Sequence, residues 1–412
     1  MPPPNVTLAG RNLTRVAWNR AAKLSRDLLH RARRAGKHAR EGGKAAKARV
    51  RATAAAGRDA GLTAYTGTVR ASRYWARVHE RTLPQLGREL SVRRELWTAA
   101  RGSGPIIAGP WLGEVGYEVL YWVPFLRWFA DHYRVHPSRI VAVSRGGVHG
   151  WYAGVADHYV ELLDLYTPDE FAARNAARQT DGEQKQHGRG AFDAAIVDRV
   201  RAMPGLGGAA VCHSSAMFRL LRQFWLGNES LEYVLDHMRF APVTTAPGLT
   251  LPPLPSRFVA MKFYTGRALP DTPANRHALR GLVEQAASTH PIVMLNTGLA
   301  LDEHEDFLFR DVPGVTTVSH ALTAANNLAV QTEVIRRADR FVGTCGSLAW
   351  LAPMLGTETL AVYDDDFLLT PHLYAARQAY RSIGAARFTP LDIHALVGLG
   401  SRRPESRAES RA

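Results

Sequence analysis

From residue 105 onward, short apolar runs alternate with stretches in which apolar residues recur every three or four positions. The short runs are typical of buried strands, and the recurring spacing is typical of helices that pack on them. In the first half this pattern predicts strands over 105–109, 139–144 and 209–213 and helices over 117–132, 152–164 and 191–202. The polar stretch 174–190 is predicted to be a mobile loop.

The alternation is more regular in the second half. It predicts strands over 257–264, 291–296, 315–319, 340–344 and 359–364 and helices over 272–289, 326–338, 347–355 and 369–383. Strands separated by helices indicate βαβ units and a parallel sheet. The stretch 241–256 holds five prolines and reads as a linker. The predicted fold class is therefore α/β, with two Rossmann-like parallel-sheet domains that face each other across a cleft.

Four regions follow from this pattern. We expect a basic, Ala/Arg-rich helical extension over 1–101, a Rossmann-like domain over 102–245, a second over 246–400 and a disordered tail over 401–412. Charge separates the first region from the rest. Residues 1–101 contain 23 Lys and Arg against 6 Asp and Glu, a net charge of +17, whereas the rest of the chain has a net charge of −2. The charge of +15 on the whole chain therefore does not indicate that the folded body binds nucleic acid.

Within the extension, residues 11–60 carry one modest apolar stripe among many cations. Basic amphipathic helices bind anionic membrane surfaces, and a solvated basic tail is the alternative. Nucleic acid is the less favoured partner, because few aromatic residues are present to stack on bases. The stripe is formed by Leu13, Val16, Ala17, Ala21, Leu24 and Leu28.

The cysteine content and the lack of a long, uninterrupted apolar segment indicate the cellular compartment. Cys212 and Cys345 are the two cysteines, too few for a disulfide framework. The most apolar long stretch, 119–130, is interrupted by Pro124 and Arg127, and no signal-peptide pattern is visible. The expected location is cytoplasmic, peripheral on the inner face of the membrane.

The second half contains a predicted anion-binding set. The run "VGTCGS" follows a strand and opens a helix, so that its backbone amides face whatever lies beyond the strand. Ser347 can also act simply as a helix N-cap. Two cations, Lys262 and Arg267, follow the first strand of the same half and can neutralise a phosphate. The predicted phosphate-binding residues are Lys262, Arg267, Gly343, Thr344, Gly346 and Ser347.

Two acidic or polar loops also follow strands. Asn296 opens the run 296–306, and Asp364 and Asp365 lie in "YDDDF". We expect these three residues to contact a sugar or a base. Solvation is the alternative for most of the first loop, and adjacent aspartates can also hold a divalent cation. No spacing matches a metal motif, and no metal is predicted.

Candidates for a catalytic base come from the first half. Glu114 lies in "GEVGYE" after the first strand, where Glu118 also can face the cleft, while His149 and His213 follow later strands. A carboxylate or imidazole at such a position can accept a proton from a substrate. We expect one of Glu114, His149 and His213 to do so.

The run "RADRFVGTCGSLAWLAPMLGTETLAVYDDD" resembles the donor-binding segment of GT-B glycosyltransferases, especially those related to heptosyltransferases and fucosyltransferases. "GEVGYE" is similar to the glycine-rich loop after the first strand of that family's N-terminal domain. The resemblance implies a nucleotide-sugar donor bound by the second half and a glycan or lipid-linked acceptor bound by the first, with no metal or other cofactor. Gly343, Thr344, Gly346 and Ser347 would hold the diphosphate, and Asp364 and Asp365 would approach the sugar. Because the chain lacks the widely spaced glutamate pair of many retaining members, inverting chemistry is expected.

Three other functions remain open. Cys345 could be the nucleophile of a hydrolase or transferase if the helix N-terminus lowers its pKa and His213 or His320 pairs with it. The three aspartates of 364–366 could form the metal-binding signature of a GT-A transferase. The chain could also be a catalytically inactive binding protein.

Overall fold

The computed structural model describes residues 87–180, 182, 186–296 and 305–395, which lie in a compact unit that starts at Gly87. The expected membrane-binding helix over 11–60 and the tail over 401–412 lie outside the described residues. Most of the loop that follows Asn296 does so as well. Among the described residues, no helix is both long and apolar enough to cross a bilayer.

The N-terminal half is built on four parallel strands. They are β1 (Ile106–Ala108), β2 (Ile140–Ser144), β3 (His158–Glu161) and β4 (Ala210–Cys212), in the order β3-β2-β1-β4. β2 and β4 both follow β1 in the chain but lie on opposite sides of it, so that the strand order changes direction between β1 and β4. Such a switch point is where open α/β sheets bind ligands.

Helices rich in aromatic residues cover this sheet. The predicted helix after β1 is present as α3 (Val115–Tyr117), the π-helical turn η1 (Glu118–Trp122) and α4 (Val123–Tyr133). A helix over residues 87–100 adds buried Val92 and Leu96 to the same core. The remaining helices are α6 (Pro168–Thr180), α7 (Ala191–Arg201), α8 (Ser215–Trp225) and α9 (Leu231–Asp236).

Two predictions for this half are wrong. The expected helix over 152–164 is instead a short 3-10 turn (Val148–Tyr152), then β3, then α5 (Leu162–Leu165). Gly154 breaks the helix at a φ of 74°, and the segment after it pairs with β2. The polar stretch from 174 is helical as far as Thr180, because Arg178 is buried and donates to the carbonyl of Leu112.

The C-terminal half contains a six-stranded parallel sheet in the order β10-β9-β8-β5-β6-β7. The strands are β5 (Val259–Lys262), β6 (Ile292–Met294), β7 (Val315–Thr317), β8 (Arg340–Thr344), β9 (Glu358–Tyr363) and β10 (Phe388–Asp392). With the first strand of this half counted as one, the order is 3-2-1-4-5-6, that of a Rossmann domain. The strand order switches direction between β5 and β8, and the rule for such sheets places a ligand there.

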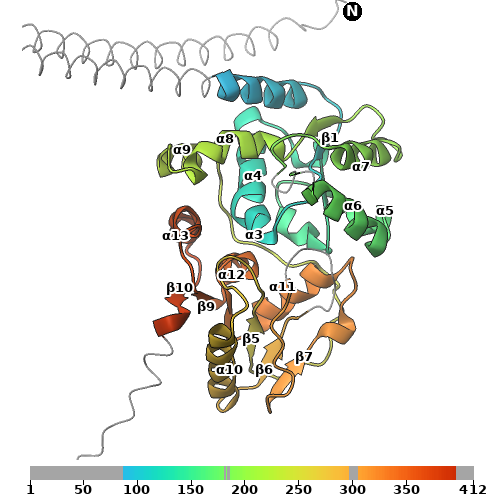
Figure 1. The fold of residues 1–412 in the computed structure, drawn as a ribbon. Coiled ribbons are helices and arrows are strands. Elements are labelled where there is room, and N and C mark those ends of the chain that lie inside the picture. The colour runs from blue at the N-terminus through green and yellow to red at the C-terminus, as the bar shows by residue number, and fades with distance from the viewer. Residues whose placement is uncertain (1–86, 181, 183–185, 297–304, 396–412) are drawn as a thin grey trace, which may run out of the picture. The chain divides into compact units, whose positions relative to one another are not determined.

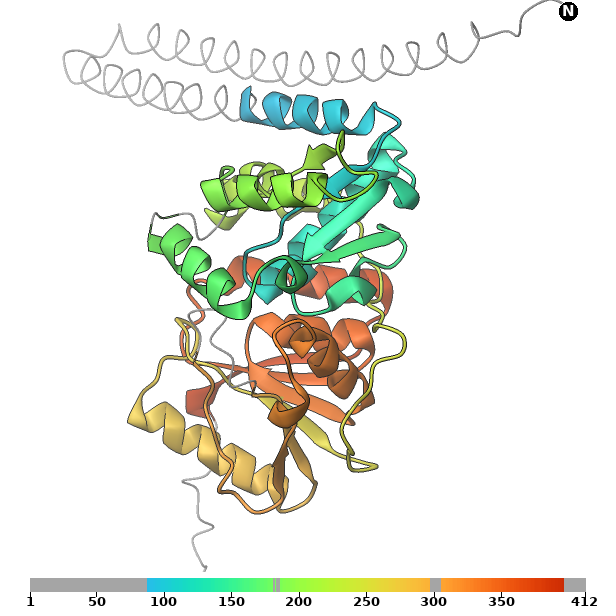
Figure 2. The same ribbon diagram turned by 90° about the vertical axis from the view of Figure 1, so that its right-hand side faces the viewer.

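The helices of this half include α10 (Pro273–Ala287), α11 (Asn327–Arg337), α12 (Ser347–Leu351) and α13 (Thr370–Ile383). α11 and α12 lie on the side of their sheet that faces the N-terminal half (Figure 1). Trp151 Nε1 donates to Thr332 Oγ1 across the contact at 3.1 Å. The proline-rich linker runs along one side of the molecule from one half to the other (Figure 2). The predicted fold class, two parallel-sheet α/β domains, is confirmed.

Candidate functional site

A cavity of about 520 Å³ lies between the two halves, at the carboxyl ends of β5 and β8. Residues from the loop after β5, the turn after β8 and the start of α13 line one side of it. Residues of α3, η1 and the end of α8 line the other. The cavity therefore occupies the position that the strand order predicts for a ligand. Of the predicted residues, the structure brings together Glu114, Arg267, Thr344, Gly346 and Ser347.

The turn after β8 has an unusual backbone. Gly346 has a φ of 137°, and Ser347 has a φ of 40° although it is not a glycine. A Cβ at position 346 would lie 2.7 Å from the hydroxyl of Tyr264, so that only glycine fits here. Thr344 holds the turn against the preceding loop, since its hydroxyl accepts from the amide of Tyr264 at 2.9 Å and donates to the carbonyl at 3.1 Å. Backbone strain of this kind is concentrated at binding sites.

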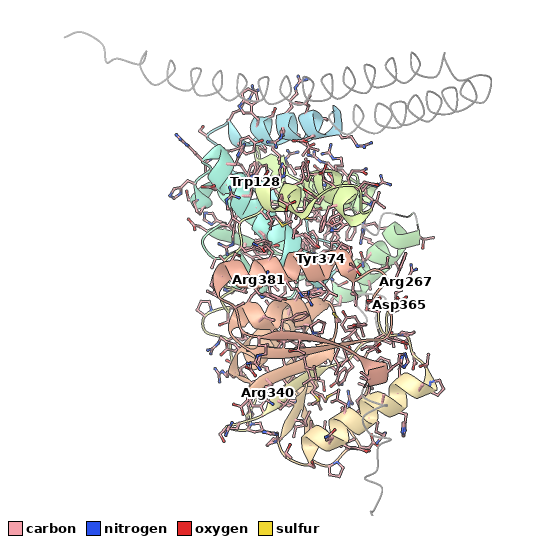
Figure 3. The ribbon with its side chains drawn as sticks, turned by 90° about the vertical axis from the view of Figure 1, so that its left-hand side faces the viewer. Trp128, Arg267, Arg340, Asp365, Tyr374 and Arg381 are labelled. Carbon is pink, nitrogen blue, oxygen red and sulfur yellow. The ribbon has the colours of Figure 1, made fainter. Side chains whose placement is uncertain are left out.

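Arg267 supplies the positive charge of the cavity. Its side chain is exposed and lies among the lining residues, close to Asp365 in Figure 3. The amides of Asp364 and Asp365 both donate to the carbonyl of Ala268, and so fix the aspartate turn beside the arginine loop. The described residues that line the cavity include no lysine and no second arginine.

Among the described residues that line the cavity, Glu114 is the one with a carboxylate side chain. It is exposed at the N-cap of α3 and makes no capping hydrogen bond. The two halves meet directly beside it, because a Cβ added to Gly116 would lie 2.8 Å from both the amide nitrogen of Ser347 and Cδ1 of Trp350. Gly116 therefore allows α3 to approach the turn after β8, and this contact brings Glu114 opposite that turn.

A cluster of aromatic side chains forms the wall on the other side of Gly116. The hydroxyls of Tyr117 and Tyr121 are hydrogen-bonded to Nε2 and Nδ1 of His372, at 3.1 and 2.7 Å. Both rings also contact Trp225 edge-on, with centroids 5.3 and 5.2 Å apart. Sequence reasoning missed His372 and Trp225, because both lie inside ordinary amphipathic helices and nothing near them in sequence indicates a site.

Several predicted residues lie elsewhere. His213 is fully buried, and its Nε2 is 2.9 Å from Oδ1 of Asp193, so it is not available as a base in the cavity. His149 lines a separate cavity of about 410 Å³. Neither histidine lines the cavity between the two halves.

The predicted cation Lys262 and the glycine Gly343 are also outside the cavity lining. Nζ of Lys262 lies 3.2 Å from Asp306, so the chain itself neutralises this charge. Gly343 lies within β8, where a Cβ would come 2.5 Å from the carbonyl of Lys262. Its role in the structure is to let the two strands approach.

Asn296, Asp364 and Asp365 have structural partners. Asn296 is buried and accepts from Thr317 Oγ1 at 3.3 Å. Asp364 accepts from Asn275 at 2.8 Å, and this bond together with His394 lowers the pKa of its carboxyl group. Oδ1 of Asp365 accepts from the amide of Phe367 at 2.8 Å and closes a turn. None of the three lines the cavity, and whether they contact a sugar stays a prediction.

Glu118 faces away from the cavity and into the N-terminal half. It is fully buried and accepts from the hydroxyls of Ser144 and Tyr152, both at 2.5 Å. Burial outweighs these bonds and raises the pKa of its carboxyl group to about 7. The residue belongs to the core, not to the site.

Cys345 does not meet the chemical requirement of a nucleophile. Its side chain is buried, and burial raises the pKa of its thiol to about 12. The thiol therefore stays protonated at neutral pH, whereas the nucleophilic form is the thiolate. Of its two proposed partners, His213 is paired with Asp193.

Asp364 and Asp365, two of the three aspartates in the alternative metal signature, accept hydrogen bonds from different partners. Among the described residues, no group of three or more His, Cys, Asp or Glu side chains is arranged to hold a metal ion.

Comparisons with known proteins give only distant structural likenesses. No protein-family model and no curated protein matches the chain. A family 9 glycosyl transferase from Veillonella parvula DSM 2008 is 13% identical over 72% of this chain and 88% of its own, with a TM-score of 0.38. The E. coli heptosyltransferase WaaC with ADP is 14% identical over 70% and 92%, with a TM-score of 0.33. SnogD from Streptomyces nogalater, also a glycosyltransferase, is 11% identical over 72% and 98%, with a TM-score of 0.32. At these values any function must rest on the residues of the cavity itself.

Proposed function

We propose that this protein transfers a sugar from a nucleoside diphosphate donor to a hydroxyl group of an acceptor bound in the cavity between its two halves. One observation carries the proposal. Among the described residues of the lining, one arginine and a strained glycine turn, at the switch point of a Rossmann sheet, lie opposite one exposed carboxylate from the other half.

The donor side is the C-terminal half. Arg267 can form charge-assisted hydrogen bonds with a diphosphate, each about twice as strong as a neutral one. Gly346 and Ser347 line the cavity together with it, and the Tyr264 hydroxyl lies beside Gly346. Cation and backbone together stabilise the charge that develops on a departing diphosphate.

The acceptor side is the N-terminal half. In the proposed step, a hydroxyl oxygen of the acceptor attacks the anomeric carbon, and the bond from that carbon to the diphosphate oxygen breaks. The hydroxyl proton passes to the carboxylate of Glu114, and the electron pair leaves with the nucleoside diphosphate. A single base is sufficient for displacement with inversion, and Glu114 is the carboxylate that the described lining supplies. We propose that this step needs no metal ion, since Arg267 provides the countercharge.

A nucleotide-sugar screen tests the proposal. Thermal unfolding is measured with UDP-, GDP-, ADP- and dTDP-sugars, and with the matching nucleosides as controls. A donor at one hundred times its Kd stabilises the native state by about 2.7 kcal/mol, which is a shift of several degrees in Tm. The proposal predicts such a shift for one nucleotide class, with the nucleoside inactive. Equal shifts for nucleoside and nucleotide sugar, or none for any class, would contradict it.

The basic segment 11–60 suggests that the protein encounters its acceptor at a membrane surface. We propose that it binds anionic membrane surfaces, because its cations lie beside an apolar stripe. Removal of residues 1–60 should weaken co-sedimentation with phosphatidylserine vesicles and leave neutral phosphatidylcholine vesicles unaffected. Unchanged binding of the truncated chain to anionic vesicles would rule the segment out.

A further inference from the structure

Several exposed apolar side chains gather around α13. Leu226, Phe367, Leu368 and Tyr374 are 59%, 72%, 46% and 57% exposed, and they are four of the seven large apolar side chains exposed among the described residues. They lie at the end of α8, in the turn before α13 and on α13 itself, and these two helices are in contact. Exposed apolar side chains that gather in this way mark a binding surface. We call these four residues the α13 patch.

The α13 patch extends beyond the cavity. Leu226, Phe367 and Leu368 are among the residues that line the cavity, but Tyr374 lies outside the lining, on the exposed face of α13. In Figure 3, Arg381 and Tyr374 follow one another along that face, toward the turn that holds Asp365. A ligand bound in the cavity therefore does not account for the whole surface.

Charges of opposite sign lie on either side of Tyr374. Asp366 precedes it by eight residues, and Arg381 follows it by seven. The amides of Leu369 and Thr370 donate to the Asp366 carbonyl at 2.8 and 3.2 Å, so the turn before α13 keeps the spacing of a helix. At 1.5 Å per residue, Asp366 and Arg381 therefore each lie roughly 11 Å from Tyr374 along the axis, in opposite directions.

Asp366 and Arg381 are both available to another molecule. Each is exposed, and within the described part of the chain neither forms an ion pair. Because seven or eight residues make about two turns of a helix, both lie on the same side of α13 as Tyr374. Asp365 lies close to Arg267 in Figure 3, which leaves Asp366 as the acid that can meet a partner.

This order of charges is self-complementary. When two α13 helices pack antiparallel about a twofold axis at Tyr374, Asp366 of each copy lies opposite Arg381 of the other copy. Two equivalent ion pairs then flank the two Tyr374 rings. A twofold interface needs such a pattern, because both copies present the same surface. An anionic membrane would attract the arginine but repel the aspartate, so the charges favour a second copy over a lipid surface.

We propose that a second copy of this chain docks on the α13 patch, with the two α13 helices antiparallel about a twofold axis at Tyr374. The ion pairs between Asp366 and Arg381 fix the alignment of the helices and exclude the parallel one. Phe367 and Tyr374 supply apolar surface between them. The inference goes beyond the proposed function and does not rest on it.

Charge reversal tests this dimer on the full chain by sedimentation equilibrium. The unaltered protein should form a dimer. Arg381→Glu and Asp366→Arg should each raise the dissociation constant of the dimer at least tenfold, because each replaces two attractions by two repulsions. The double variant D366R/R381E should return to within about threefold of the unaltered protein, since both pairs re-form with their signs exchanged. Arg340→Glu is the matched control, because Arg340 is exposed and lies away from α13 in Figure 3.

The pattern across these variants decides the inference. Recovery in D366R/R381E would support it and would also show that the single variants are folded. A protein that stays monomeric, single variants that dimerise like the unaltered chain, or a double variant as weak as the single ones would each overturn it. An effect of R340E as large as that of R381E would overturn it as well.

Two further measurements separate the inference from other readings of the same surface. If the unaltered protein is monomeric and Tyr374→Ser abolishes its binding to phosphatidylcholine vesicles, the α13 patch is a membrane surface and the inference fails. Nucleotide-sugar binding by the charge variants reports on the proposed function alone, because Asp366 and Arg381 lie outside the cavity lining. If that binding is present while the dimer is absent, only the inference fails.

Discussion

The two halves share a strand order around their first strand but use the carboxyl edge of the sheet differently. In the N-terminal half, three of the ionisable side chains near that edge are buried and bonded within the half, whereas Glu114 is exposed. Arg145 donates to the Gly113 carbonyl, Glu161 accepts from the amides of Gly146 and Gly147, and His213 pairs with Asp193. In the C-terminal half, Arg267 at the same edge is exposed in the cavity.

This difference shows that a strand-end position alone does not make a residue functional. Among the described residues, the buried Asp, Glu, Lys, Arg and His side chains belong to the N-terminal half, with Glu333 as the exception in the other half. The N-terminal half uses them to fix its loops. In the C-terminal half, the switch point between β5 and β8 adjoins the cavity.

The largest expected effect concerns the internal charges of the N-terminal half. The pKa of Glu118 is about 7 in the folded protein, whereas the ordinary value of 4.5 applies to the unfolded chain. The folded state therefore binds the proton of Glu118 more tightly than the unfolded chain does. The free energy of unfolding should therefore fall as pH rises from about 4.5 to 7, by roughly 3 kcal/mol from this group. Glu118→Gln should remove this fall, measured by urea unfolding at pH 5 and pH 8.

Glu161 and Arg145 also act on Glu118, so the decisive quantity is the difference in slope between the wild type and E118Q. Glu114→Gln is the control, because Glu114 is exposed on the same segment. Parallel profiles for the wild type and E118Q would show that the buried carboxyl group does not affect stability in this pH range.

A smaller effect is expected where the two halves touch. In Gly116→Ala the new methyl group would lie 2.8 Å from the Ser347 amide and from Trp350. Overpacking of this kind destabilises a protein by about 1–3 kcal/mol, and displacement of the turn should also weaken donor binding. Denaturant unfolding and calorimetry of the same variant measure both effects.

Gly281→Ala is the matched control, because position 281 lies in α10 with open space around it. Replacing glycine by alanine inside a helix stabilises it by about 0.5–1 kcal/mol. If G116A behaved like G281A, the close contact between the halves would not exist in solution.

The sequence predicted the periodic parts of this fold well, for a physical reason. Apolar residues recur with a fixed period in the helices that pack on a sheet, and they form short continuous runs in buried parallel strands. Both patterns are clear in the sequence of the second half. The prediction for 152–164 was wrong because the apolar spacing there fits a helix. Gly154 interrupts that helix, and the residues after it form β3, which pairs with β2. The edge strand β10 was missed, since only Phe388 and Leu391 give it a large apolar side chain and none of its residues is fully buried.

The residues of the site were harder to predict. Whether a strand-end side chain is available to a ligand depends on whether another side chain pairs with it, and the sequence does not show these pairs. His213 and Lys262 are both at strand ends, but Asp193 and Asp306 engage them. Those partners lie 20 and 44 residues away in the chain. Glu114, Arg267 and the turn after β8 lie in the cavity as expected, while His372 enters it only through the packing of α13 on η1.

The most direct test compares three substitutions in the calorimetric titration of whichever nucleoside diphosphate stabilises the protein. Arg267→Ala should weaken binding at least tenfold, since a charged hydrogen bond contributes about 1.5–3 kcal/mol. Arg381→Ala, at an exposed position of α13 away from Arg267 (Figure 3), and Cys345→Ser should change it less than twofold. Full affinity in R267A, or loss of binding in C345S with the fold intact, would contradict a phosphate site formed by Arg267 and the turn after β8.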